Sequence, residues 1–236
     1  MRSKTFSALF VVQGKPPPDR EADYHRWYDT MHGPDALAYG SFREMRRYRA
    51  IGPGDANAPY LALWNGDYVN EAEAWGHIRP LAEKMRVAGR LDDIASVKFA
   101  LMMFSVPPNG VCAPSVATPT LTTVQNDWRH ASEAASADVW WSATGLEDAP
   151  GIEDARLYTS DPAGKGAGFH LALFDQSCTA AEAALKWRGI GTPGSSPTPP
   201  YQVMFKEPDA VAETVSEGPV KASAWTMHWE LITALP

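Results

Sequence analysis

Hydrophobic and polar positions in the first hundred residues follow two spacings, one typical of helices and one typical of strands. Starting from Tyr24, apolar side chains recur at the i, i+3, i+4, i+7 spacing of an amphipathic helix, and the Gly33-Pro34 pair is predicted to end that helix. Short apolar or β-branched runs bounded by Gly, Pro or Asn predict strands. The predicted strands are residues 7–13, 42–50, 60–64 and 97–106, and the predicted helices are residues 20–32 and 71–87.

The second half of the chain shows the same order of patterns after a linker rich in Pro and small residues at positions 107–119. An insertion at about 189–205, with no counterpart in the first half, is expected to form a lid or an extra edge strand. The predicted strands of this half are residues 121–127, 152–159, 169–174 and 224–232, and the predicted helices are residues 132–144 and 179–188.

An internal repeat explains this parallel order. FREMRRYRA at 42–50 is echoed by IEDARLYTS 110 residues later, and YLALWNGD at 60–67 is echoed by HLALFDQS at the same offset. Self-similarity of this length indicates two copies of one small domain rather than a solenoid. The predicted domains are a first repeat at 1–106, the linker at 107–119 and a second repeat at 120–236.

Each predicted repeat has the β-α-β-β-α-β order of a ferredoxin-like unit. A four-stranded sheet with helices on one face leaves its other face to be covered. Two such sheets packed face to face would cover each other. The predicted fold class is therefore α+β, with two tandem ferredoxin-like units forming one intramolecular α/β barrel.

Composition and charge indicate which partners and which cellular compartment to expect. The 236 residues carry a net charge of −7, which argues against nucleic acid as a partner because phosphate binding needs a basic face. No apolar run approaches the roughly 18 residues that span a bilayer, and the N-terminus lacks a signal-peptide pattern. We expect a cytoplasmic protein, a monomeric pseudo-dimer or a homodimer of it, in which Cys112 and Cys178 are ordinary thiols.

His32 is the first candidate for catalysis. It stands at the end of the predicted helix, and the aligned position in the second repeat is Leu146, so only one copy keeps an imidazole. An imidazole exchanges protons near neutral pH. The alternative is that His32 only caps the helix, where a cation is favoured.

A metal site on the same helix is considered and rejected. His25, Asp29 and His32 share a helical stripe, but the spacing from His25 to His32 is about 10 Å along the axis. We therefore predict no metal site and interpret His25 with Asp29 as a surface pair.

Arg46 and Tyr48 recur as Arg156 and Tyr158. They are candidates to hold a substrate carboxylate and to stabilise a developing oxyanion, or else to join the two sheets. Arg47, on the opposite strand face, would add positive potential.

Aromatic residues suggest a binding site for flat, unsaturated molecules. The alternative is that these side chains form an ordinary core. The candidate lining residues, besides Arg47, are Tyr24, Trp27, Tyr28, Tyr60, Trp64, Met102 and His170.

The segment YHRWYDTMHGPDAL at 24–37 resembles the dimeric α/β-barrel superfamily, and in particular its EthD-like branch. That branch carries an aromatic-rich first helix that ends in a His closely followed by Pro, here His32 and Pro34. The resemblance covers residues 5–105, and reaches the second half only through the repeat. It implies a barrel usually made by two subunits, and a ligand pocket between the helices and the sheet. Members include cofactor-free monooxygenases, cyclases, isomerases, dehydratases and haem-handling proteins.

The function predicted from these residues is a cofactor-independent isomerase or lyase acting on a small unsaturated or aromatic carboxylate, such as a ring-cleavage product. His32 would be the general acid/base, Arg46 the carboxylate clamp, and Tyr48 or Tyr28 the oxyanion stabiliser. One alternative is a cofactor-free monooxygenase or a haem-handling protein with His32 or His170 as axial ligand. The other is a protein that binds a hydrophobic metabolite without catalysis.

Overall fold

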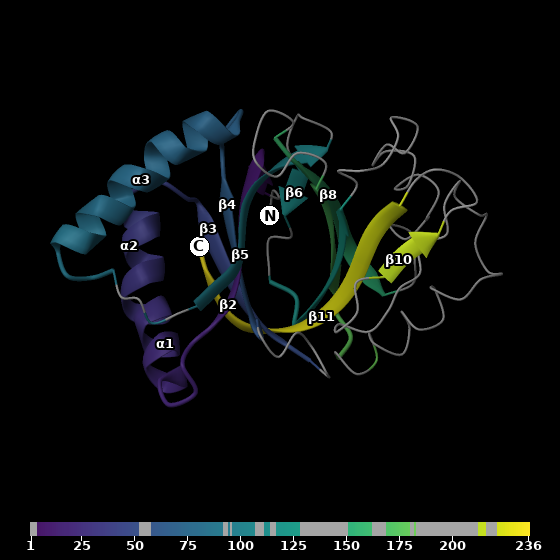
Figure 1. Ribbon diagram of the computed structural model, residues 1–236, viewed down its shortest axis with the longest axis horizontal. Helices are drawn as coiled ribbons and strands as arrows, with labels where there is room; N and C mark the ends of the chain where they lie inside the picture. Colours follow the sequence, from purple (N-terminus) through teal and green to yellow (C-terminus); the bar gives the residue numbers. More distant parts are fainter. Residues whose placement is uncertain are drawn as a thin grey trace.

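The chain folds around an antiparallel barrel with helices packed against one side, as the computed structural model shows (Figure 1). The sheet has nine strands in the order β10-β11-β3-β4-β2-β5-β8-β9-β7, and pairing of β7 with β11 closes eight of them into a ring. The residues that the structure describes are 4–51, 58–91, 94, 96–106, 111–113, 117–127, 151–161, 169–179, 182, 212–215 and 221–236.

The first half has the predicted ferredoxin-like order. Its four sheet strands lie in the order β3-β4-β2-β5, and α3 has the bounds that the sequence predicted. Asn70 caps α3 by accepting a hydrogen bond from the backbone N–H of Glu73 at 2.9 Å. The elements are β1 (Lys4–Phe6), β2 (Ala8–Lys15), α1 (Glu21–Trp27), η1 (Tyr28–His32), α2 (Gly33–Ala38), β3 (Glu44–Ala50), β4 (Tyr60–Gly66), α3 (Glu71–Val87) and β5 (Ser96–Val106).

The first helix does not end at Gly33-Pro34, so that prediction was wrong. A π-helical turn, η1, connects α1 to α2, and the backbone N–H of Gly33 donates to the carbonyl of Tyr28, five residues earlier. Pro34 has no N–H and would clash with the preceding turn of a regular α-helix. The wider π turn accommodates it. Such turns occur frequently at functional sites.

The second half contributes four barrel strands in the order β8-β9-β7-β11, the same relative order as in the first half. The predicted helices at 132–144 and 179–188, and the insertion at 189–205, lie outside the described residues apart from positions 179 and 182. Within the predicted linker, β6 pairs with β1. The elements are β6 (Val111–Ala113), β7 (Thr120–Asp127), β8 (Ile152–Ser160), β9 (Phe169–Gln176), β10 (Ala212–Val215) and β11 (Lys221–Leu235).

The strands of the two halves pair with each other at two places, β5 with β8 and β3 with β11. In each pair, the last barrel strand of one half lies beside the second barrel strand of the other. The pairing registers of the halves also match: Arg46 faces Leu63 across β3 and β4, and Arg156 faces Leu173 across β8 and β9. Both residues of the second pair lie 110 positions after those of the first, the offset seen in the sequence.

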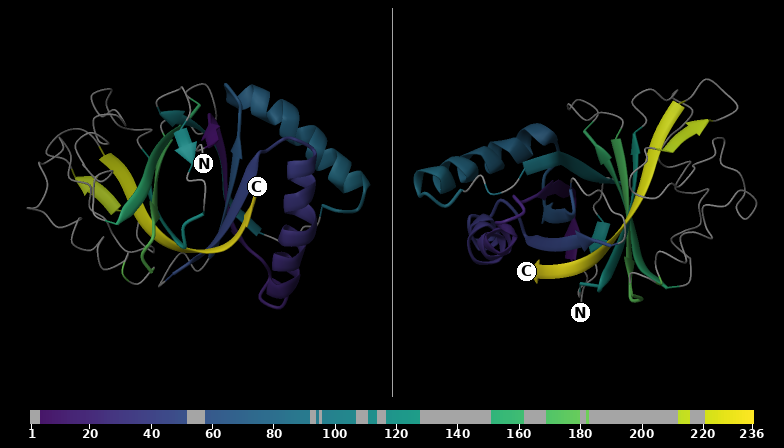
Figure 2. Two further views of the ribbon diagram at one scale, coloured as in Figure 1. Left: turned by 180° about the vertical axis from the view of Figure 1, so that it is seen from behind. Right: turned by 60° about the horizontal axis from the view of Figure 1, so that its bottom comes forward.

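Alternation along the strands separates two cores. One fills the barrel and includes Leu9, Tyr48, Tyr158 and Trp229. The other lies between the first-half sheet and its helices, which cover one side of the barrel in both views of Figure 2. None of the helices in the described residues is long and apolar enough to cross a membrane.

Candidate functional site

The helix-covered face of the first half holds most of the residues predicted to line a site. Their side chains form one packed aromatic cluster, to which Arg47 adds a guanidinium. Each of the aromatic members is less than one tenth exposed. The members are Tyr24, Trp27, Tyr28, Tyr60, Trp64 and Met102.

His32 lies at the end of the π turn against this cluster. Its ring stacks on Trp27 with 4.4 Å between centroids, and meets Tyr28 and Trp64 edge-on at 5.0 and 5.2 Å. The Nδ1 atom is buried and has no hydrogen-bond partner in the described part of the chain. No hydrogen bond joins Nε2 to another described residue either.

The environment of His32 keeps its imidazole neutral. Burial is the main cause that lowers the pKa of His32 to about 4; the carboxylate of Asp35 acts in the opposite direction, and the charge of Arg47 lowers it further. An orphaned Nδ1 is consistent with this, because an imidazolium carries two N–H groups that need acceptors. A buried polar atom without a partner requires an explanation, and catalysis is one of the recognised ones.

Arg47 is the cation on the same side of the sheet as His32. Its side chain is 1% exposed; Nη1 donates to Asp29 Oδ1 at 2.7 Å and Nη2 contacts His25 Nδ1 at 2.9 Å. The guanidinium carbon lies 4.3 Å from the ring centroid of Tyr28. His25 and Asp29 are therefore not the simple surface pair that the sequence predicted, because each binds Arg47. In the described part of the chain no three His, Cys, Asp or Glu side chains are grouped as metal ligands.

Tyr60 ties the sheet to the start of α1. Its hydroxyl donates to Glu21 Oε1. Burial, followed by the hydrogen bond and charge of Glu21, raises the pKa of Tyr60 to about 12. This hydroxyl is therefore an anchor for α1 rather than an acid poised near neutral pH.

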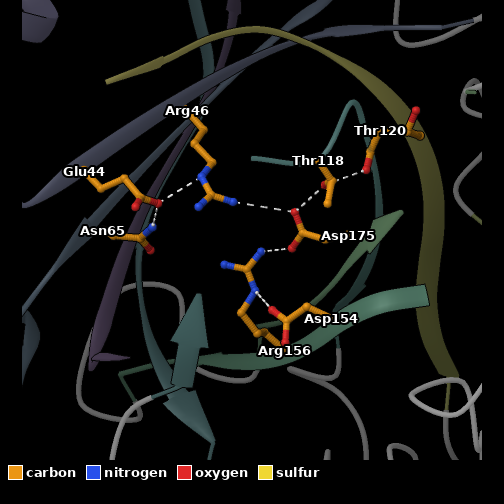
Figure 3. A network of polar contacts seen from close by, with 8 residues as sticks. All are labelled: Glu44, Arg46, Asn65, Thr118, Thr120, Asp154, Arg156 and Asp175. Carbon is orange, nitrogen blue, oxygen red and sulfur yellow. Dashed lines mark hydrogen bonds and ion pairs between the residues drawn. The ribbon is translucent and has the colours of Figure 1, made fainter. Parts of the chain in front are cut away.

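Arg46 and Tyr48 point to the other face of the sheet, into the barrel, so the predicted combination of His32 with these two residues was wrong. Arg46 Nε contacts Glu44 Oε1 at 2.9 Å, and Nη1 lies 3.7 Å from Asp175 Oδ1 of the other half (Figure 3). Strand residues two apart share a face, and position 47 therefore faces His32 while 46 and 48 do not.

A second arginine completes this interior network. Arg156 binds Asp175 Oδ2 and contacts Asp154 Oδ2 at 2.9 Å (Figure 3). Thr118 donates to Asp175 Oδ1 at 2.9 Å. Glu44 with Asp154, and Arg46 with Arg156, stand 110 positions apart. The sequence left open whether Arg46 and Tyr48 hold a substrate or join the two sheets, and the ion pair between Arg46 and Asp175 fits the second alternative.

Two buried tyrosines lie beside this network. The hydroxyls of Tyr48 and Tyr158 make no well-aligned hydrogen bond with the described residues, and they lie near the guanidinium groups of Arg46 and Arg156. Burial raises the pKa of Tyr48, as does the charge of Asp175, so its phenol stays protonated. Neither side chain is accessible to a substrate.

His170 lies on β9 in the second half, away from the His32 cluster. It pairs in register with Thr159 and Asn126, and its neighbours Leu171 and Leu173 face the barrel interior. The outer face of this half carries polar contacts beside the buried side chain of Phe174: Gln176 Nε2 donates to Thr122 Oγ1 at 2.6 Å, and Thr122 Oγ1 contacts His228 Nδ1 at 2.9 Å.

A pocket that the sequence did not predict lies between α2 and the C-terminal end of α3. It has a volume of about 350 Å³. Arg90 donates to the carboxylate of Asp35 from Nε at 2.5 Å and from Nη2 at 2.8 Å. Asp35 belongs to the segment 24–37, but no sequence pattern paired it with a residue 55 positions later. The lining residues are Asp35, Ala38, Tyr39, Leu81, Lys84, Met85, Ala88 and Arg90.

Comparison with known proteins identifies the fold. No protein-family model and no curated protein sequence matches the chain. A DyP-type peroxidase from Mycobacterium smegmatis has 11% identity and a TM-score of 0.56, with 98% of this chain and 94% of that one covered. An anthrone oxidase-like protein has 10% identity and a TM-score of 0.54, covering 99% and 95%. A haem-binding protein from Thermus thermophilus has 7% identity and a TM-score of 0.52, covering 98% and 93%.

These likenesses run the length of the chain but are too distant in sequence to transfer an activity. They agree with the α+β fold of the ferredoxin-like α/β-barrel proteins. Neither His32 nor His170 is among the residues that line the pocket between α2 and α3.

Proposed function

We propose that this chain is a cofactor-independent enzyme that moves a proton on a small unsaturated or aromatic carboxylate, with His32 as the proton acceptor. The observation that carries the proposal is His32 itself. Its imidazole is neutral, sits among aromatic rings at a π-helical turn, and has no partner on either nitrogen among the described residues. Flat ligands suit an aromatic surface of this kind.

The proposed chemistry takes place at Nε2 of His32. Nε2 takes a proton from a carbon of the substrate, and the electron pair of that C–H bond spreads over the conjugated system. Returning the proton from Nε2 to another carbon gives an isomer; loss of a leaving group instead gives an elimination. A base with a pKa near 4 removes protons only from acidic C–H groups, which favours carbons activated by both a carbonyl and a double bond.

Arg47 supports this site from behind. It is buried and already bound by Asp29 and His25, so it does not clamp a substrate. Its charge instead disfavours the protonated form of His32 and would favour a developing anion nearby. This is the positive potential that the sequence predicted for Arg47, and not the carboxylate clamp that it predicted for Arg46.

Solvent-deuterium exchange tests the proposal even where the product has not been identified. Aromatic acids and dienoates are incubated in D₂O with the protein, and exchange at carbon is followed by NMR. We expect exchange with the wild type, a loss of at least about 100-fold in His32→Gln, and no change in His77→Gln, which alters an exposed histidine of α3.

Equal exchange by wild type and His32→Gln would remove His32 from the mechanism. Tight binding of one of these acids without any exchange would mean that the chain is a binding protein and not an enzyme. Stoichiometric dioxygen uptake with the same substrates would replace isomerisation by oxidation. A Soret band in freshly purified protein would replace the proposal by a haem-dependent function.

The proposal includes the two-repeat origin of the barrel and its EthD-like character. The matching strand orders, the shared register at Arg46 and Arg156, and the repeated ion pairs support a duplicated unit at 1–106 and 120–236. The segment from Trp27 to Pro34 supports the EthD-like assignment, since its histidine falls at the site proposed for chemistry.

A further inference from the structure

The pocket between α2 and α3 has a polar rim and an apolar floor. Leu81 and Met85 form the floor; they are 5% and 3% exposed and belong to the same core cluster as Trp27 and Trp64. Lys84 and Arg90 provide two cations against the single carboxylate of Asp35. A volume of about 350 Å³ lies at the small end of ligand-binding pockets.

Lys84 is held in place without being neutralised. Its ammonium lies 4.9 Å from the ring centroid of Tyr39, a contact of the cation–π type. No carboxylate of the described residues pairs with it; the ion pairs of α3 and its surroundings use Arg86 with Glu83, and Arg90 with Asp35. A cation fixed at a pocket mouth in this way is available to an anionic ligand.

Arg90 is positioned by the turn that ends α3. Gly89 has a φ of +66°, in the region that favours glycine, and the backbone N–H of Arg90 donates to the carbonyl of Met85 at 2.8 Å. This turn brings the guanidinium over the helix end, where its fork holds the carboxylate of Asp35. The two parallel N–H groups with which Arg90 binds Asp35 could bind the carboxylate of a ligand in the same way.

Two connections join this pocket to His32. Asp35 follows His32 by three residues on the helical segment, so the two side chains are neighbours on its surface. Trp27, which stacks on His32, donates its indole N–H to the backbone carbonyl of Arg90 at 2.9 Å. The pocket and the imidazole are thus linked through Asp35 and Trp27.

We propose that this pocket binds the carboxylate end of a small amphipathic monocarboxylate. Lys84 and Arg90 hold the carboxylate, Leu81 and Met85 contact the apolar body, and Asp35 competes with the ligand for Arg90. That the bound acid is the substrate of His32 rests on the proposed function; that the pocket binds such acids does not.

Benzoate, with benzamide as its uncharged counterpart, tests the pocket. The dissociation constants are measured by calorimetry, and the site is located from the ¹³C signals of the methionine methyl groups. We expect benzoate to bind more tightly than benzamide. We also expect it to shift the signal of Met85 but not that of Met103, which lies inside the barrel.

Three substitutions give effects of different sign. Lys84→Met should weaken benzoate binding about fivefold, the scale of one exposed ion pair. Asp35→Asn should strengthen it by a similar factor, because it removes the competing carboxylate and frees Arg90. Arg86→Met is the matched control: it removes a positive charge from the same helix outside the pocket and should leave binding unchanged.

Equal binding of benzoate and benzamide, weaker binding in Asp35→Asn, or equal losses in Lys84→Met and Arg86→Met would overturn the pocket proposal. His32→Gln separates it from the proposed function. Benzoate should bind His32→Gln as tightly as the wild type, even though proton exchange is lost. If benzoate binds the pocket but exchange is unchanged in His32→Gln, only the proposed function is refuted.

Discussion

The barrel interior and the helix-covered outer face of the first half both bury polar side chains. The interior pairs its charged groups with one another, whereas the outer face leaves an imidazole without a hydrogen bond to any described residue. Inside the barrel, Arg46 and Arg156 share Asp175, and each has a further carboxylate on its own strand. On the outer face, His32 is surrounded by aromatic rings and has no hydrogen-bond partner among the described residues. The two arginines and the carboxylates on their own strands recur at a fixed offset in the sequence, and His32 does not.

This difference separates structure from chemistry. A joint between two similar halves needs the same residues from each, so repetition is the expected mark of a closing network. A catalytic group needs only one copy, and it must remain unsatisfied until a substrate arrives. Recurrence therefore argues against Arg46 and Tyr48 as catalytic residues, and its absence is consistent with a role for His32.

The largest effect is expected from breaking the interior network. Asp175→Asn removes the carboxylate that both arginines share and leaves their charges buried without full compensation. Removing one partner of a buried pair costs about 3–5 kcal/mol. Urea unfolding measures it. Asp67→Asn is the matched control: its partner Arg43 lies at 3.2 Å with both side chains at least half exposed, so the cost should stay below about 1 kcal/mol. Similar costs at both sites would show that the interior network does not hold the halves together.

The next test concerns the protonation of His32. Because its folded pKa lies near 4 rather than 6.5, the base form is retained as the pH falls. At pH 5 about 90% of a group with pKa 4 is unprotonated, against about 3% of a group with pKa 6.5. The acid limb of kcat/KM should therefore fall near pH 4. An acid limb near 6.5 would mean that the imidazole is solvated.

The same shift affects stability in a defined direction. Between pH 6.5 and 4 the unfolded chain binds a proton on His32 that the folded chain does not, so stability decreases as the pH falls through this window. His32→Leu removes this contribution. Its unfolding free energy should depend less steeply on pH between 6.5 and 4 than that of the wild type.

The sequence predicted much of the barrel because its signals are local. The strand runs and the α3 boundaries depend on residues near one another in the chain, and the repeat offset needs only a comparison of the chain with itself. It did not predict the continuation of the helix through Pro34, because Pro normally ends an α-helix and a π turn leaves no pattern of its own. It also placed Arg46 as well as Arg47 in the site with His32. Strand alternation correctly separated the two arginines, but nothing local told which face the helix would cover.

The pocket was missed for a similar reason. Arg90 and Asp35 are 55 positions apart, and neither has a counterpart that would draw attention to it. The helix-side cluster, by contrast, was predicted from the aromatic spacing of a single helix together with the outward residues of β4. Function on this fold therefore depends on contacts that only tertiary structure brings together.

A smaller effect tests how closely α2 is packed on the sheet beside His32. A Cβ at Gly33 would lie 2.8 Å from both Leu235 Cδ1 and the carbonyl oxygen of Tyr28. Gly33→Ala should therefore destabilise by about 1–3 kcal/mol through overpacking. Gly76→Ala, in α3 with nothing within 4 Å, should stabilise by about 1 kcal/mol from helix propensity alone. Thermal unfolding of both variants measures the contrast, and equal stabilisation would mean that α2 is not in close contact with β11.

The smallest effect is expected from a substitution at Tyr48, which lies in the barrel interior and not on the outer face with His32. If this tyrosine stabilised an oxyanion, Tyr48→Phe would lower turnover strongly. Its hydroxyl instead lies in the barrel, without a well-aligned hydrogen bond to the described residues and on the opposite side of the sheet from His32. Removing a buried hydroxyl that has no well-aligned partner also removes its desolvation penalty. Tyr48→Phe should therefore leave proton exchange at the wild-type rate and change the unfolding free energy by less than about 1 kcal/mol. A large loss of exchange in a variant of unchanged stability would return Tyr48 to the active site, and would mean that the substrate reaches the barrel interior.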